Sequence, residues 1–71
     1  MKIYAIYYID DCSRDYFMRR EGALNCGMEC IRQIGEEENW DPQEIESLID
    51  EFLREEWADD LCALEEIEVK E

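Results

Sequence analysis

The most constraining feature of this sequence is an apolar run near its start that needs burial from both sides. Residues 2 to 9 read Lys-Ile-Tyr-Ala-Ile-Tyr-Tyr-Ile and are followed by Asp10 and Asp11. β-Branched and aromatic residues at this density are typical of a strand. Successive side chains of a strand point to opposite faces, and here both faces are apolar. The pattern predicts a strand over 2–9 that needs a second layer or a second chain.

A helical pattern follows a short polar connection over 12–15. Apolar residues then recur at three- and four-residue steps: Ala23, Cys26, Cys30, Ile31 and Ile34. This spacing predicts a helix over 16–34, with Ser13 as its N-cap and Gly35 just past its end. Two glycines inside the helix each weaken it by about 1 kcal/mol relative to alanine. The helix can therefore begin as late as Arg20.

The second helix has clear start signals. Asp41 can cap it, Pro42 occupies the first turn, and Glu44 completes an arrangement that resembles a capping box. The apolar residues that follow match one helical face: Ile45, Leu48, Ile49, Phe52, Leu53 and Trp57. We expect a helix over 42–57, with Trp57 at the end of its apolar stripe.

The closing segment, residues 61 to 69, ends with apolar and charged residues in alternation, which predicts a strand. Its first residues could equally extend a helix. The expected order is β-α-α-β, in a single α+β domain of residues 1–71 with two layers. Because the two helices bring the chain back, the first and last strands should pair antiparallel. Two strands alone are marginal, so we expect a homodimer to complete the sheet or to pack its faces.

Charge composition argues against several functions. The sequence has 21 acidic and 7 basic residues and no histidine, for a net charge of −14. Direct binding to nucleic acid or to an anionic membrane needs clustered Lys and Arg, so it is disfavoured. Without histidine, catalytic triads lack their usual base. We expect no enzyme activity, no catalytic residues and no cofactor.

The amino-acid sequence also shows no recognisable targeting signal. The sequence has no apolar stretch of eighteen residues, and its start lacks a basic region followed by an apolar run and a cleavage site. These features predict a cytoplasmic protein without a membrane segment. Reduced thiols are then the expected state of its cysteines.

Four cysteines raise the question of a metal or redox site. The candidates are Cys12, Cys26, Cys30 and Cys62. Zinc sites built from four thiolates normally use two C-x2-C pairs, whereas the only close pair here has three intervening residues. Cys26 and Cys30 fall on the predicted apolar helix face, so we favour buried, small core residues. The alternative is a small metal- or redox-responsive regulator that uses this pair with Cys12 or Cys62.

The negative charge is confined to one half of the chain. Residues 1 to 35 hold five acidic and five basic residues, whereas residues 36 to 71 hold sixteen acidic residues and two basic ones. Because the apolar stripe of the second helix should point inward, its acidic residues should project outward. The predicted partner-binding residues are Glu44, Glu46, Asp50, Glu51, Glu55 and Asp59. Same-face neighbours on a helix are about 5 to 6 Å apart, a separation comparable with that of phosphates along DNA.

This combination resembles the small acidic proteins of phages and mobile elements that block host defence, including anti-CRISPR proteins and DNA mimics. The acidic residues from Glu36 to Glu68 carry the resemblance. It implies a stoichiometric inhibitor that occupies the nucleic-acid channel or a subunit surface of a CRISPR effector or a similar complex. The partner would be a basic protein or nucleoprotein complex. If a phage carries the gene, the two proteins would bind each other in the cytoplasm of the host bacterium. The alternative is an accessory subunit whose acidity only keeps its surface solvated.

Overall fold

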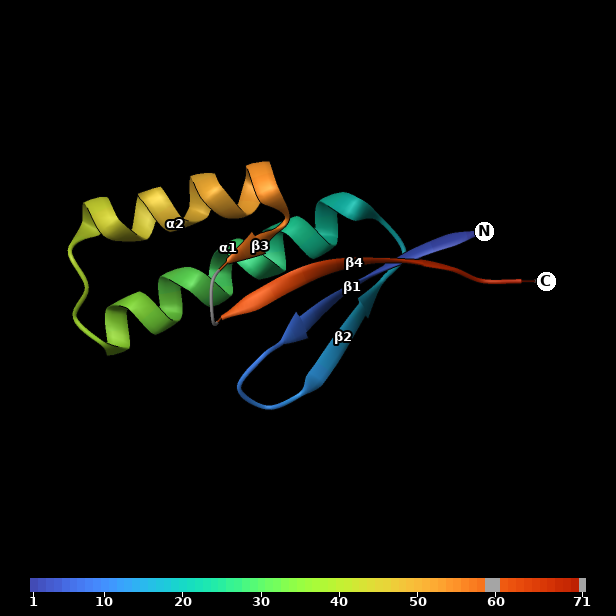
Figure 1. Ribbon diagram of the computed structural model, residues 1–71, viewed down its shortest axis with the longest axis horizontal. Coiled ribbons are helices and arrows are strands. Elements are labelled where there is room, and N and C mark those ends of the chain that lie inside the picture. The colour runs from blue at the N-terminus through green and yellow to red at the C-terminus, as the bar shows by residue number, and fades with distance from the viewer. Residues whose placement is uncertain (59–60, 71) are drawn as a thin grey trace.

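The chain folds into an antiparallel sheet of four strands with two helices on one side of the β1–β2 hairpin (Figure 1). The computed structural model describes residues 1–58 and 61–70. Its elements, in chain order, are β1 (Lys2–Tyr8), β2 (Ser13–Phe17), α1 (Arg20–Glu37), α2 (Pro42–Glu55), β3 (Trp57–Ala58) and β4 (Cys62–Glu68). The predicted α+β class is confirmed, and the expected β-α-α-β order gains one strand before the helices and one after them.

The predicted pairing of the first and last strands is confirmed. The strand order is β2-β1-β4-β3, so β1 lies at the centre between β2 and β4. Ile6 of β1 is opposite Leu64 of β4, and Tyr4 is opposite Phe17 of β2. The central position of β1 explains the apolar residues that face the helices, such as Ile6, whereas Ile3 and Tyr7 lie on its other face, away from both helices. Within this chain, β2 and β3 extend the sheet beyond the two strands expected from the sequence.

The segment predicted as a polar connection is instead strand β2. Ser13 is its first residue and caps no helix, and the helix begins at Arg20, the later of the two expected starts. A four-residue turn over 9–12 joins β1 to β2, and Cys12 adopts a left-handed conformation there, with φ of 54°. The residues of β2 are mostly polar and exposed, so their strand conformation depends on hydrogen bonding to β1.

Gly35 lies inside α1, so the prediction that it ends this helix is wrong. The helix continues to Glu37, and Gly35 faces α2. A β-carbon at this position would lie 2.6 Å from the Ile45 side chain and 3.3 Å from the Trp40 ring. Close approach of the two helices, and not the termination of one, therefore requires a glycine here.

Helix α2 begins as predicted and ends two residues early. The Asp41 carboxylate accepts a hydrogen bond from the Gln43 backbone N–H at 2.9 Å, and Pro42 occupies the first position. Glu56 ends the helix in a left-handed conformation, with φ of 62°, and its N–H donates to the Phe52 carbonyl at 2.7 Å. Trp57 is therefore part of β3 and is not the last residue of the helical stripe.

The core lies between the helices and one face of the sheet. Its largest fully buried side chains are Phe52, Ile6, Ile31 and Cys62. Helix α1 contacts β1, β2 and β4, whereas α2 contacts α1 and β3. Across residues 1–58 and 61–70, neither helix is long and apolar enough to span a lipid bilayer.

Candidate interaction surface

The predicted partner-binding residues that the structure describes lie on α2. Five of them are exposed on the helix: Glu44, Glu46, Asp50, Glu51 and Glu55. Their exposure follows from the burial of Ile49 and Phe52 on the opposite side of the same helix. The sixth, Asp59, lies outside the described residues. The inward apolar stripe thus places the acidic side chains in solvent, as the sequence pattern predicted.

These five carboxylates form two rows along α2 and not a single stripe. At 100° per residue, one row consists of Glu44, Glu51 and Glu55. The second row consists of Glu46 and Asp50, one turn apart on the other flank of the helix. Arg54 lies between the rows, on the most outward part of the helix. The solvent half of α2 is therefore negative along both edges.

The link between the helices extends this negative region. Glu36 near the end of α1, and Glu38 and Asp41 in the link, are exposed, whereas Glu37 lines a different hollow with Tyr8 of β1. With the five residues on α2, Glu36, Glu38 and Asp41 form what we call the acidic surface, which contains eight carboxylates and a single base, Arg54. The surface occupies α2, the link before it and the end of α1, whereas Glu56, Glu65, Glu66 and Glu68 lie outside it.

Ion pairs among the described residues use other acidic side chains. Lys2 pairs with Glu66 at 3.3 Å, Arg14 with Glu65 at 2.5 Å, and Arg20 with Glu56 at 2.6 Å. All three pairs involve β4 or the residue after α2, so no carboxylate of the acidic surface has a basic partner within residues 1–58 and 61–70. Pairs as exposed as these contribute little stability, about 0 to 1 kcal/mol each. Ion pairs among the described residues therefore do not neutralise the acidic surface.

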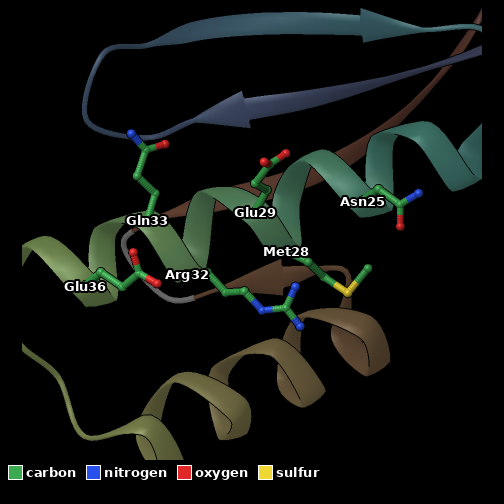
Figure 2. A pocket seen from close by; sticks show the side chains of 6 residues that line it. All are labelled: Asn25, Met28, Glu29, Arg32, Gln33 and Glu36. Atoms are coloured by element: carbon green, nitrogen blue, oxygen red, sulfur yellow. The ribbon is translucent and has the colours of Figure 1, made fainter.

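One base borders the acidic surface on α1. A shallow hollow on the outer face of α1 is lined by Asn25, Met28, Glu29, Arg32, Gln33 and Glu36. Figure 2 shows Arg32 extending toward α2, whereas Glu29 and Gln33 point toward the β1–β2 hairpin. Arg32 also lines a second hollow together with Glu46 of the acidic surface. Its positive charge therefore limits the negative potential on this flank.

Three of the four cysteines meet beneath α1. The Tyr8 hydroxyl donates to Asp15 at 2.7 Å and lies 3.0 Å from the Cys26 sulfur. Burial and these two hydrogen bonds raise the pKa of Tyr8 well above its usual value. Burial, together with the neighbouring Cys30 thiol, raises the pKa of Cys62 to about 12. Burial also raises the pKa of Cys30.

Cys12 lies apart from this cluster, in the β1–β2 turn, where its thiol approaches the Ile9 carbonyl at 3.8 Å. Within the described part of the chain, no three or more Cys, Asp or Glu residues are arranged to hold a metal ion. Thiols with raised pKa are mostly protonated near neutral pH and are weak nucleophiles. Of the clustered thiols, Cys62 is a buried core residue, whereas Cys26 and Cys30 are only partly buried. Sequence alone did not indicate the Tyr8–Cys26 contact, because it depends on how α1 is placed over the sheet.

No family model, curated protein or solved structure matches this chain.

Proposed function

We propose that this protein is a non-enzymatic inhibitor that binds a basic, nucleic-acid-handling protein through the acidic surface. The bound protein would be a CRISPR effector or a similar defence complex, and binding would block access of nucleic acid. The observation that carries the proposal is the concentration of eight exposed carboxylates, without ion-pair partners among the described residues, on α2 and the adjoining link.

The net charge of this chain exceeds what solubility needs. A net charge of about 2 to 8 suffices for a small domain, whereas this chain carries −14. Like charges held this close repel one another and destabilise the folded state. Binding to a surface rich in Lys and Arg would relieve that repulsion, since each carboxylate would gain an opposite charge.

The two rows on α2 resemble the charge arrangement of a nucleic-acid groove. A helix with its side chains is about 10 to 12 Å across, so the rows lie on the order of 10 Å apart. The DNA major groove, which separates two phosphate backbones, is about 12 Å wide. A protein that binds phosphates along both edges of a groove could therefore contact both rows. Arg54 lies between the two rows, a position that corresponds to the middle of the groove. In DNA the phosphates lie along the edges of the groove and not at its middle.

Inhibition would be stoichiometric and sensitive to salt. The negative surface would attract a basic site from beyond contact distance and raise the association rate. At 0.15 M salt the Debye length is about 8 Å, so this attraction weakens as salt rises. Once bound, the helix would occupy the space that nucleic acid requires.

Capture from a bacterial lysate tests this proposal. Immobilised protein should retain basic, nucleic-acid-binding proteins at 50 mM NaCl and release them at 500 mM. A duplex DNA oligonucleotide added to the column should also displace them, because DNA and the inhibitor would occupy the same site.

A charge-reversal variant provides the decisive comparison. Replacing Glu44, Asp50, Glu51 and Glu55 with Lys should abolish capture while the circular-dichroism spectrum stays unchanged. Capture that survives this change, or captured proteins that DNA does not displace, would reject the proposal.

A further inference from the structure

The face of the sheet that points away from the helices carries large apolar side chains. Ile6, Leu64 and Cys62 point into the core, so the alternate residues of the strands point outward. This open face displays Ile3, Tyr7, Tyr16, Trp57 and Ile67. Tyr16 is 61% exposed and Trp57 is 55% exposed. Neighbouring large side chains nevertheless cover Ala5 completely.

The open face is electrically neutral. Its two charged side chains are Arg14 and Glu65, and they pair with each other across β1. The Arg14 guanidinium also stacks over the Tyr7 ring, 4.6 Å from its centroid. Exposed aromatic groups around a neutral centre are typical of a protein interface.

We propose that the open face binds a second copy of this chain, so that two sheets pack face to face in a symmetric dimer. This proposal is independent of whether the acidic surface binds a basic protein. If two copies associate, charge favours contact through the open face over contact through any other face. Packed sheets lie about 10 Å apart and each helix layer adds about 10 Å, so the two acidic surfaces would be about 30 Å apart. That distance exceeds the Debye length of about 8 Å severalfold, so their repulsion is weaker in this dimer than in one that brings the acidic surfaces together.

Two-fold symmetry also matches the pattern of side chains. A two-fold axis parallel to the strands places β1 of one copy over β4 of the other, and β2 over β3. One row across the sheet reads Arg14, Tyr7, Ala63 and Trp57. Under this symmetry Arg14 lies over Trp57 of the other copy, a favourable cation–π arrangement, and Tyr7 lies over Ala63.

The same operation places Ile3 over Ile67 of the other copy, since these two residues are direct neighbours on β1 and β4. Apolar groups thus meet at this end of the interface, whereas in the middle row Glu65 lies over Ala5 of the other copy. Edge pairing into a continuous sheet is less favourable, because β3 has two residues and β2 presents Arg14 and Asp15 within five.

The size of the open face predicts a weak dimer. Strand spacing and rise give a face of on the order of 400 Å² per copy. Twice this area is below the roughly 1,200 to 2,000 Å² of stable complexes. We therefore expect half-dimerisation at a concentration on the order of 100 μM.

Sedimentation velocity between 5 and 500 μM in 150 mM NaCl tests the dimer. The wild type should shift from monomer to dimer, and 500 mM NaCl should strengthen the dimer because it screens the charge of both copies. Trp57 fluorescence, isolated in a Trp40→Phe variant, should shift to shorter wavelength as the dimer forms. A chain that stays monomeric to 500 μM at both salt concentrations would overturn the proposal and leave this face to a different protein.

Matched variants locate the interface. Tyr16→Glu and Trp57→Ser should remain monomeric, whereas Leu53→Glu, which adds a charge at an apolar residue on α2 that is 43% exposed, should dimerise like the wild type. Circular dichroism at 5 μM confirms that each variant is folded. A dimer that survives both sheet variants would contradict the proposed interface. Higher salt should strengthen this dimer and weaken the binding of a basic protein to the acidic surface. Failure of this proposal is therefore distinguishable from failure of the proposed function.

Discussion

The Phe52 ring of α2 lies against the backbone of Gly27 in α1, in the space that a β-carbon at position 27 would occupy. One turn and two turns further along α1, Ile31 is fully buried and Gly35 meets Ile45 in the same way. The two glycines therefore allow the helices to approach closely. This contact fixes the position of α2, and with it the direction in which the acidic surface faces.

Alanine at either glycine should destabilise the protein. A β-carbon at position 27 would overlap the Phe52 ring, and one at position 35 would lie 2.6 Å from Ile45. Overpacking of this kind costs about 1 to 3 kcal/mol. Helix propensity alone favours alanine by about 1 kcal/mol, so the sign of the effect separates the two causes. We expect Gly27→Ala and Gly35→Ala to lower the free energy of unfolding measured in urea.

Gly22→Ala is the matched control on the same helix. A β-carbon there would lie 3.4 Å from the Phe17 ring, which is an ordinary contact distance. We expect this substitution to stabilise the protein by up to about 1 kcal/mol. Equal stabilisation by alanine at positions 22, 27 and 35 would contradict the close helix contact.

Stability should fall in alkaline solution. Burial raises the pKa of Cys62 from 9.0 to about 12, so the folded state keeps this thiol protonated where the unfolded state has lost its proton. The stabilisation is complete below pH 9 and is lost as the pH rises toward 12. The loss proceeds at up to about 1.4 kcal/mol per pH unit. Urea unfolding at pH 7, 9 and 10.5 should show this decline.

Cys62→Ala should reduce the slope of that decline above pH 9, although the cavity it leaves lowers stability at every pH. Tyr8 and Cys30 also have raised pKa values and contribute the part of the slope that remains. The prediction fails if the variant and the wild type lose stability equally steeply above pH 9.

Removing the bases near the acidic surface should strengthen capture of basic proteins. Arg54 lies between the two rows of α2, and Arg32 lines a hollow with Glu46. A basic partner would be repelled by both, so Arg54→Gln and Arg32→Gln should each raise affinity about 2- to 5-fold at 50 mM NaCl. Lys70→Gln, in the segment that follows β4, serves as the control for net charge. Similar gains in all three variants would show that total charge, and not this surface, controls binding.

Periodicity predicted most of this fold correctly. Both helices, the first strand and the last strand follow from apolar spacing, and their antiparallel pairing follows from the short link between the helices. Strand β2 was missed because its sequence, Ser-Arg-Asp-Tyr-Phe, has no strong pattern of its own. Its conformation arises from pairing with β1, an interaction between strands that local propensity does not record.

The surface was predictable in part. The inward stripe that includes Ile49 and Phe52 indicated that the acidic residues of α2 face solvent, and the structure places the five described ones there. Their division into two rows follows from helical spacing alone. The ion pairs of β4 depend on strand register, and the exposure of Trp57 depends on where Glu56 ends α2. Neither could be derived from the sequence pattern.

A comparison of two variants with the same net charge tests the central claim most directly. The first neutralises one row of the acidic surface, with Glu44→Gln, Glu51→Gln and Glu55→Gln. The second neutralises three exposed acidic residues elsewhere, with Asp10→Asn, Asp11→Asn and Glu68→Gln. Capture of basic proteins from lysate is then quantified at 50 mM NaCl. We predict that the first variant loses about tenfold or more in capture and that the second stays close to the wild type. Equal losses in the two variants would contradict a defined binding surface.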